Sequence, residues 1–528
     1  MLCRVYCACS KGLDVFTITV EVDVSGGISF FLVGLPDNAV KESQQRISCA
    51  LARYGYKIPG KKIIINLAPA NLKKEGSAFD LAIAIGIIQA SEQIEFVNPQ
   101  KFLILGELAL DGSLRAISGA LPIILHAKKE GFTGCILPYD SAIEGREIDD
   151  FTIFGADNLE EVIEILKEPE LAVDYLVQER FMRRAKRAYS STSKSSNYYS
   201  SDFKYVKGQQ MAKRGLEIAA AGGHNVIMVG SPGSGKTMMA KCLASILPTM
   251  SREEAIETSK IYSVAGLFNA YNGLIKERPF REPHHTSTVQ ALAGSGVHGM
   301  PGEISLAHNG VLFLDEFAEF PRYAIEILRQ PLEERVIQIC RAKSRVCYPA
   351  SFMLVAAMNP CPCGYLHEPN GRCRCSSSAI TKYSAKISGP ILDRIDIQLT
   401  VKPVGADIIT ASPVAEHGES SETIAGRVLR AREIQLQRFK GESFYTNANI
   451  PQSQLNNYCG VGESERKFLK KLVESNNLSA RGYSRLLKIS RTIADLDGKD
   501  FISLSHISQA MQFRVFSAGI VDVNFGEF

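Results

Sequence analysis

A glycine-rich loop between an apolar run and a helical pattern constrains this chain more than any other feature. Residues 226–229 are all apolar and predict a short buried strand, and residues 238–246 predict a helix. The residues between them match the phosphate-loop pattern at every place: Gly230, Ser231, Pro232, Gly233, Ser234, Gly235, Lys236 and Thr237. Glycines let backbone N–H groups turn toward phosphate oxygens, and the helix start adds partial positive charge. The alternative, a chance glycine-rich turn, does not explain the flanking strand and helix. We therefore predict a nucleotide site in which Lys236 reaches the phosphates and Thr237 binds Mg²⁺.

An acidic pair follows a second apolar run. Residues 310–314 predict a strand buried on both faces of a parallel sheet, and Asp315 and Glu316 stand at its carboxyl end, where ligands bind in such sheets. Asp315 would hold Mg²⁺, and Glu316 would polarise the water that attacks the γ-phosphate. The alternative is a solvated strand end, which becomes less favoured beside a phosphate loop.

Two further polar residues suit the same chemistry. Asn359 ends a third apolar run and could contact the γ-phosphate or the attacking water, although it could instead cap the loop before Pro360. Arg394 could pair locally with Asp393 or Asp396. Alternatively, Arg394 is an arginine finger that reaches a neighbouring subunit's nucleotide, which would require a ring.

Segments spread along the whole chain resemble the ComM/YifB family of magnesium-chelatase-like AAA+ ATPases. They are Val206-Lys-Gly-Gln209, Ala219-Ala-Ala-Gly-Gly-His-Asn225, Arg278-Pro-Phe-Arg-Glu-Pro-His-His285, Pro301-Gly-Glu-Ile-Ser-Leu-Ala-His308 and Met358-Asn-Pro-Cys-Pro-Cys-Gly364. The resemblance implies an α/β fold: an AAA+ parallel-sheet core of the helix-2-insert class, a C-terminal helical lid, and a preceding α+β domain like that of Lon protease and ribosomal protein S5.

The same resemblance implies a function and roles for residues. It implies ATP and Mg²⁺ as cofactors, a homo-hexameric ring, and a helicase that promotes DNA branch migration in recombination or natural transformation. By resemblance Asn359 is the sensor-1 residue, Arg394 the finger acting in trans, and Arg481 the sensor-2 arginine, with Arg485 as the alternative.

Composition along the chain predicts its division into parts. Residues 180–201 are first basic and then rich in serine, which predicts a linker because such a segment cannot bury a core. We expect a Lon-like domain at 1–170, a linker at 171–204, the ATPase core at 205–402 and a helical lid at 403–528.

The N-terminal domain lacks the Ser-Lys dyad of the Lon proteases that it resembles. Aligning Lys74-Glu-Gly-Ser-Ala-Phe-Asp80 puts Ala78 at the nucleophile position, with Ser77 one place away, and aligning from Gly106 puts Leu121 at the lysine position. We expect no peptidase activity, and a role in ring assembly or DNA handling instead.

Two Cys-x-Cys pairs predict a structural zinc site. Cys361 and Cys363 form one pair, and Cys373 and Cys375 form the other, so four thiolates could close a tetrahedral Zn²⁺ site. The alternative is a loop of four reduced thiols without metal.

A basic hairpin is the predicted DNA contact. Residues 336–348 read as two strands around a polar turn, with Arg341, Lys343 and Arg345 at its tip. In helix-2-insert rings such a hairpin projects into the pore, where it would bind the DNA backbone independently of sequence. A solvated turn is the alternative. The competing function, from another class, is a chelatase-type ATPase that remodels a protein partner.

Composition sets the remaining limits. The chain has 528 residues and a net charge of +4, so DNA binding must depend on a local basic patch rather than on overall charge. We see no apolar window long enough for a membrane span and no signal peptide, and 13 cysteines in a chain this long do not indicate a disulfide framework. These features predict a cytoplasmic protein without a membrane partner.

Overall fold

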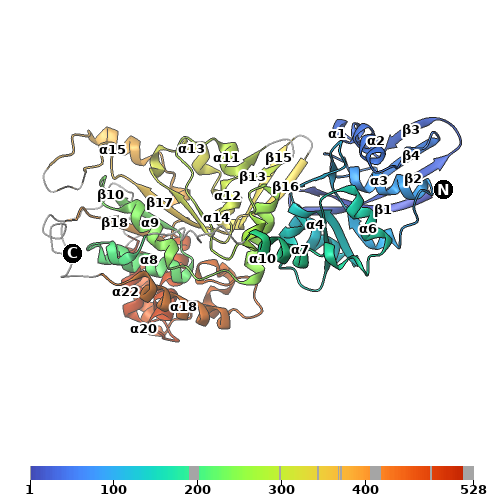
Figure 1. Ribbon diagram of the computed structural model, residues 1–528. Coiled ribbons are helices and arrows are strands. Elements are labelled where there is room, and N and C mark those ends of the chain that lie inside the picture. The colour runs from blue at the N-terminus through green and yellow to red at the C-terminus, as the bar shows by residue number, and fades with distance from the viewer. Residues whose placement is uncertain are drawn as a thin grey trace.

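The computed structural model describes residues 2–188, 201–295, 299–341, 344–366, 368, 371–404, 418–475 and 478–514. The chain folds into an N-terminal unit, a parallel-sheet part that corresponds to the expected ATPase core, and a helical C-terminal part. In Figure 1 the N-terminal unit lies at the right, the core to its left, and the C-terminal helices below the core.

A mixed seven-stranded sheet forms the N-terminal unit, in the order β3-β4-β2-β1-β5-β8-β9. Strands β1, β2 and β4 pair antiparallel, and the other neighbours pair parallel. The strands are β1 (Leu2–Lys11), β2 (Asp14–Ser25), β3 (Ser29–Val33), β4 (Lys62–Ala68), β5 (Phe102–Ile104), β8 (Gly134–Pro138) and β9 (Thr152–Ala156). The main helices are α2 (Ser43–Arg53), α3 (Asp80–Ala90), α4 (Ala120–Lys129) and α6 (Leu159–Lys167). Helix α3 is apolar on all sides and is buried against β1 and β2, so it forms the centre of this core.

The described part of the predicted linker is helical. Residues 177–188 form α7 (Val177–Ala188), which packs on the N-terminal unit. Arg180 pairs with Asp157 at 2.6 Å and with Glu161 at 2.7 Å, and the Arg146 guanidinium stacks on the Phe181 ring. Part of the expected linker therefore forms a helix, because its basic side chains pair with acidic residues that precede it in the sequence. The serine-rich residues 189–200 lie outside the described part of the chain.

A parallel five-stranded sheet, in the order β11-β14-β17-β10-β18, forms the ATPase core. Its strands are β11 (Phe280–Arg281), β14 (Val311–Leu314), β17 (Met353–Met358), β10 (Val226–Gly230) and β18 (Ile397–Val401). The helices α8 (Gln210–Gly222), α9 (Lys236–Ser245) and α10 (Arg252–Val264) belong to the same part. The apolar runs predicted as buried strands are these strands, and β10, β14 and β17 are buried throughout.

A hairpin and a helical part complete the chain. Helix α14 (Arg329–Glu334) leads into the antiparallel hairpin of β15 (Val336–Arg341) and β16 (Ser344–Pro349). The C-terminal part contains α18 (Ser421–Arg438), α19 (Leu455–Tyr458), α20 (Glu463–Ser475), α21 (Ala480–Leu496) and α22 (Leu504–Gln512). It shares one hydrophobic core with α8 and the parallel sheet. This architecture confirms the predicted α/β class, with a parallel-sheet core, a helical C-terminal part and a preceding α+β domain.

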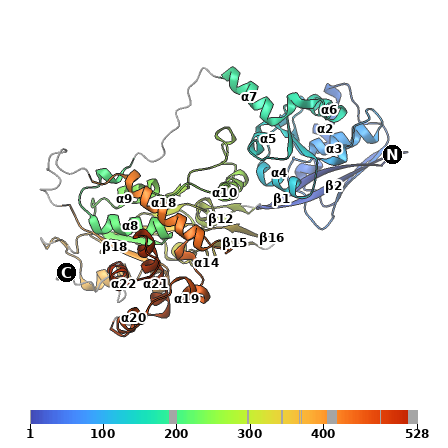
Figure 2. The ribbon, with the colours of Figure 1, turned by 90° about the horizontal axis from the view of Figure 1, so that it is seen from below.

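The N-terminal unit contacts the ATPase core at two places. Helix α4 packs on α10, where Leu121 and Met250 belong to one small buried cluster (Figures 1 and 2). The Ser263 hydroxyl donates to the Glu144 carboxylate at 2.5 Å across this contact. At the second place, the turn between β1 and β2 lies on β16: a Cβ added to Gly12 would come 2.3 Å from Val346.

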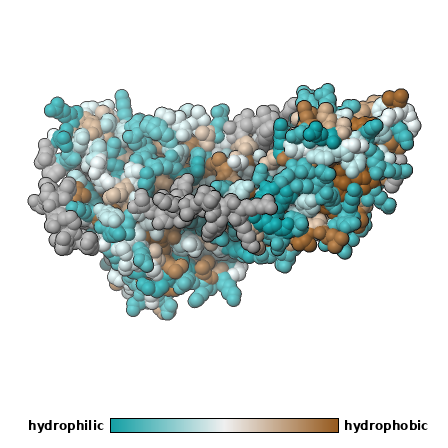
Figure 3. Space-filling model, in the orientation of Figure 1, coloured by the Kyte–Doolittle hydropathy of each residue, from teal (hydrophilic) through white to brown (hydrophobic). Residues whose placement is uncertain are grey.

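Exposed apolar side chains gather on and beside the edge strand β3. They are Ile28, Phe31, Val33 and Leu35. Figure 3 shows patches of hydrophobic surface at the right-hand end of the molecule, the end where β3 lies in Figure 1. Within the described ranges, no helix is both long and apolar enough to cross a membrane.

Candidate functional site: a phosphate pocket and its surroundings

The residues predicted to bind the nucleotide meet at the carboxyl ends of the parallel strands. The phosphate loop follows β10, the acidic pair follows β14 and Asn359 follows β17, so all three stand at the carboxyl ends of adjacent parallel strands. Together they border a cavity of about 700 Å³, which we call the phosphate pocket. Its lining residues are Pro232–Met238, Glu282, Pro283, His284, His285, Asp315, Glu316 and Asn359.

Lys236 is the positive group at the base of this pocket. Its Nζ donates to the carbonyl oxygens of Gly230 at 2.7 Å and Ser231 at 2.9 Å, and to Asn359 Oδ1 at 3.3 Å. Burial lowers the pKa of Lys236 from its usual value, while Asp315 opposes this shift. The loop carbonyls and Asn359 thus hold an ammonium group where phosphate oxygens would bind.

Thr237 and Asp315 form the second polar contact. The Thr237 hydroxyl donates to Asp315 Oδ2 at 2.6 Å, and the other Asp315 oxygen accepts from the Glu316 backbone N–H at 2.9 Å. A hydroxyl and a carboxylate at this separation are the ligand types that Mg²⁺ takes beside nucleotide phosphates. These residues therefore fit the predicted ion.

Glu316 is held by a histidine whose role the sequence did not show. Glu316 adopts a left-handed backbone conformation with φ of 51°, and its side chain is 55 % exposed. His285 Nδ1 lies 2.9 Å from the Glu316 carboxylate, and the His284 ring lies against His285 with centroids 4.1 Å apart.

The predicted arginine finger, Arg394, lies at the amino ends of the parallel strands, whereas the phosphate pocket lies at their carboxyl ends. Strand β18 runs parallel to β10, with Ile397 beside Val226 and Val401 beside Gly230. Arg394 precedes Ile397, whereas the phosphate loop follows Gly230, so the two are separated by the strand length, about 13 Å for four steps of about 3.3 Å. Arg394 pairs with Glu333 at 2.5 Å, and not with Asp393 or Asp396 as its local alternative supposed.

The two sensor-2 candidates lie near Arg394. Arg481 pairs with Glu333 at 3.2 Å, whereas Arg485 pairs with Asp396 and donates to the Arg394 carbonyl oxygen. Among the described residues, no arginine lines the phosphate pocket. None of the three arginines thus faces the nucleotide site of its own chain.

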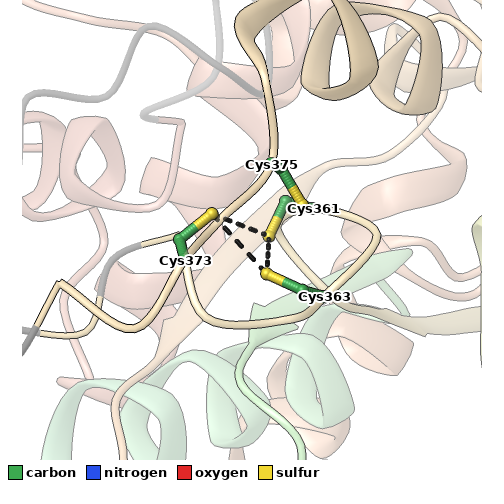
Figure 4. Close-up of side chains that lie close together, drawn as sticks. All are labelled: Cys361, Cys363, Cys373 and Cys375. Carbon is green, nitrogen blue, oxygen red and sulfur yellow. Dashed lines mark hydrogen bonds between the residues drawn. The ribbon is translucent and has the colours of Figure 1, made fainter.

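The four loop cysteines converge (Figure 4). Cys361, Cys363, Cys373 and Cys375 place their sulfur atoms within 4.8 Å of one another. Three of the sulfur pairs are 3.4, 3.6 and 3.7 Å apart. Tetrahedral zinc with Zn–S bonds of about 2.3 Å spaces its sulfurs by about 3.8 Å, so the donors fit this metal. A backbone N–H from Tyr365 lowers the pKa of Cys363 to about 6, which favours the thiolate form.

The cysteine loop (residues 361–375) contacts the phosphate loop. A Cβ added to Gly364 would come 2.5 Å from Pro232 Cδ and 3.7 Å from Asn359 Cγ. The loop that gathers the cysteines therefore packs against two residues that line the phosphate pocket.

The basic hairpin (β15 and β16) is described in part. Arg341 ends β15 opposite Ser344, and Arg345 is exposed on β16 opposite Cys340. The Arg341 side chain and the whole of Lys343 lie outside the described residues.

The residues that align with or lie next to the Lon catalytic dyad make other contacts in the N-terminal unit. The Ser77 hydroxyl donates to Glu107, Ala78 is partly buried, and Leu121 is fully buried in the cluster against α10. Lys74 is fully buried and donates to the Pro69 carbonyl oxygen.

A phosphate loop, an acidic pair and a polar strand end on one edge of a parallel sheet define a P-loop ATPase. Three family models of the magnesium chelatase subunit ChlI match this chain. One matches residues 202–408, a second matches residues 20–141, and a model of the C-terminal part of ChlI matches residues 418–514.

Full-length relatives agree with these matches. The competence protein ComM of Haemophilus influenzae is 41 % identical over 517 residues, and the uncharacterized protein YifB of Salmonella typhimurium is 39 % identical over 514 residues; each alignment covers 97 % of both chains. A shorter match, 32 % identical over 132 residues, joins 24 % of this chain to 23 % of Lon protease 2 of Bacillus subtilis. The chain belongs to the ComM/YifB family of magnesium-chelatase-like AAA+ ATPases, as the sequence predicted.

Proposed function

We propose that this protein is an ATP-driven hexameric DNA motor that promotes branch migration. The phosphate pocket carries the ATPase part of the proposal, because the Lys236–Asn359 contact and the Thr237–Asp315 contact line the same cavity. In this pocket Lys236 neutralises phosphate charge, Asn359 contacts the γ-phosphate, and Glu316 orients the attacking water. Thr237 and Asp315 would hold Mg²⁺, which supplies further charge neutralisation when bound.

The arrangement of the arginines supports a ring. Arg394 cannot reach the phosphate loop of its own chain, so as a finger it would serve a neighbour's nucleotide. Arg481, held by the same Glu333, would reach the same neighbouring site, and Arg485 is the less favoured sensor because it pairs with Asp396.

Relatives and charge favour DNA as the partner. The full-length likeness to a protein named for competence, and the exposed Arg345 on a hairpin with two further basic residues, support a sequence-independent DNA contact. The chelatase matches also allow an ATPase that remodels a protein partner. We propose that the protein works in the cytoplasm and, without its Ser-Lys dyad, is not a peptidase.

The test is to neutralise the basic hairpin. Replacing Arg341, Lys343 and Arg345 by Ala should leave basal ATP turnover nearly unchanged but abolish its stimulation by forked DNA and the migration of four-way junctions. Binding should weaken for all sequences alike, and the slope of log K against log salt should fall by about 0.9 for each lost duplex phosphate contact.

The matched control removes the same charge from α20. Arg466, Lys467 and Lys470 are exposed there, and their replacement by Ala should leave DNA stimulation intact. If the hairpin variant is still stimulated by forks like the unmodified protein, the DNA path lies elsewhere. Stimulation by a protein partner in place of DNA would favour the chelatase-type function.

We further propose that the cysteine loop binds one structural Zn²⁺. Four protein sulfurs leave no open position for water, so the metal would have no catalytic role. Elemental analysis after metal-replete expression should find about one zinc per chain, and none in the Cys361→Ser/Cys363→Ser variant. The exposed Cys49 and Cys347 serve as the control pair, and their replacement by Ser should leave the zinc content unchanged. A metal-free unmodified protein would exclude the site.

A further inference from the structure

One carboxylate joins two arginines that come from different parts of the chain. Glu333, near the end of α14, places a single oxygen, Oε1, 2.5 Å from Arg394 Nη2 and 3.2 Å from Arg481 Nη2. Arg394 precedes β18 in the ATPase core, whereas Arg481 stands in the first turn of α21 in the helical lid. The shared oxygen therefore links the ATPase core to the helical C-terminal part, at the amino ends of the parallel strands and away from the phosphate pocket.

Arg394 is held tightly but incompletely. Its side chain is only 7 % exposed, and its Nη1 donates to the Pro390 carbonyl oxygen at 2.6 Å. Its Nε is buried and has no acceptor within the part of the chain that the structure describes. A buried donor without a partner is unfavourable by about 1–3 kcal/mol, so the site has capacity for another acceptor. Arg481 is different, because 53 % of its side chain is exposed.

The guanidinium groups of Arg394 and Arg481 both contact Glu333 Oε1, and two positive charges this close to one atom would repel each other without the carboxylate. Glu333 neutralises one of the two charges and fixes both groups through one oxygen. It is itself 44 % exposed, so an anion approaching from outside the subunit could reach this cluster. Phosphate oxygens have the charge and the acceptor geometry that guanidinium groups prefer.

We propose that Glu333 is a positioning residue for ATP hydrolysis in the neighbouring subunit. It holds Arg394 and Arg481 at a fixed separation, so that core and lid present both to one nucleotide across the subunit boundary. This inference rests on the proposed ring and trans finger, and it adds the group that orients them.

The Glu333→Gln variant should separate this role from pocket chemistry. The amide keeps the shape but loses the charge that pairs two cations. Because misplacing a positioned group by about 1 Å can cost about 100-fold in rate, we expect kcat to fall by about 10- to 100-fold. The KM for ATP should change less than about 2-fold, because the phosphate pocket of each chain is untouched. Glu334→Gln is the matched control: Glu334 is the next residue in α14, is exposed, and accepts a hydrogen bond from the Gln330 side-chain amide at 2.8 Å.

Mixed rings then test whether Glu333 acts in trans. Unmodified subunits are mixed with donor subunits that bind ATP but cannot hydrolyse it because they carry Glu316→Gln. Four donors are compared: Glu316→Gln alone, or combined with Arg394→Ala, Glu333→Gln or Glu334→Gln. Turnover per unmodified subunit is measured as the donor fraction rises, with assembly checked by light scattering.

The expected result is that the Arg394→Ala and Glu333→Gln donors lower turnover in unmodified subunits more than the other two. If the Arg394→Ala donor lowers it and the Glu333→Gln donor does not, Glu333 has no positioning role and the ring proposal survives. If neither donor differs from Glu316→Gln alone in assembled rings, the trans finger fails, and the role of Glu333 fails with it.

Discussion

Within the phosphate pocket, nucleotide binding and hydrolysis are expected to depend on different side chains, Lys236 for binding and Glu316 for hydrolysis. Lys236 is buried against the loop that would hold the phosphates, whereas the Glu316 side chain is half-exposed and pairs with His285. Lys236→Ala should therefore abolish ATP binding, because it removes the positive charge at the phosphate position.

Glu316→Gln should bind ATP with nearly unchanged affinity but lower turnover by at least about 100-fold, the scale at which a general base contributes. Fluorescent-nucleotide titration and phosphate release measure the two effects. The control is Glu319→Gln, an exposed carboxylate nearby that pairs with Lys386 at 3.0 Å. Equal affinity and turnover in both variants would contradict the assigned roles.

At this residue scale, local motifs were predictable and distant contacts were not. The phosphate loop, the acidic pair and Asn359 each end a recognisable apolar run, so their places followed from strand positions. His285 and Glu333 carry no such signal. Their roles arise because β11 lies beside β14, and because Glu333 of α14 pairs with Arg481 of α21, which no short stretch of sequence specifies.

At the scale of elements, the cysteine loop and the phosphate loop are in contact through Gly364. This glycine has φ of +86°, and an added Cβ would lie 2.5 Å from the Pro232 ring. Gly364→Ala should therefore displace the phosphate loop and raise the KM for ATP by about 5-fold or more, since overpacking costs about 1–3 kcal/mol.

Gly371→Ala is the control within the same loop. Gly371 also has a positive φ, +57°, but an added Cβ would meet no atom of the described residues within 4 Å. Backbone strain is thus shared, and only the contact with Pro232 differs. Steady-state kinetics at varied ATP should show the KM increase for Gly364→Ala alone; similar KM values for both variants would exclude the contact as its cause.

The elements themselves were largely predictable where apolar runs dominate, as in β10, β14 and β17. Helix α7 was not, because it is basic and has little apolar surface. It forms through ion pairs and ring contacts with the N-terminal unit, and such partners are invisible in local composition.

At the scale of the whole molecule, the partly buried carboxylate of Glu144 lies between the N-terminal unit and the ATPase core. Burial raises the pKa of Glu144 from its ordinary 4.5 to about 7, although hydrogen bonds from Ser263 and the Leu121 N–H oppose this shift. The folded protein therefore binds more protons than the unfolded chain between these values. This contribution to stability is complete below about pH 4.5 and is lost as the pH rises through about 7.

Glu144→Gln should remove this pH dependence, because the amide resembles the protonated carboxyl group. Thermal midpoints measured from pH 5 to pH 8 should fall more steeply for the unmodified protein than for the variant. Parallel curves for the two proteins would show that Glu144 does not titrate in this range.

The contact of Gly12, in the turn between β1 and β2, with Val346 of β16 has a mechanical consequence. The N-terminal unit has one continuous core, and it touches the ATPase core both at β16 and at α10. A stiff body fastened at two points fixes the distance between those points. The basic hairpin therefore cannot shift relative to α10 unless the N-terminal unit moves with it or releases one attachment. If force on DNA is generated by displacing this hairpin, the N-terminal unit is part of the load that each ATP must move.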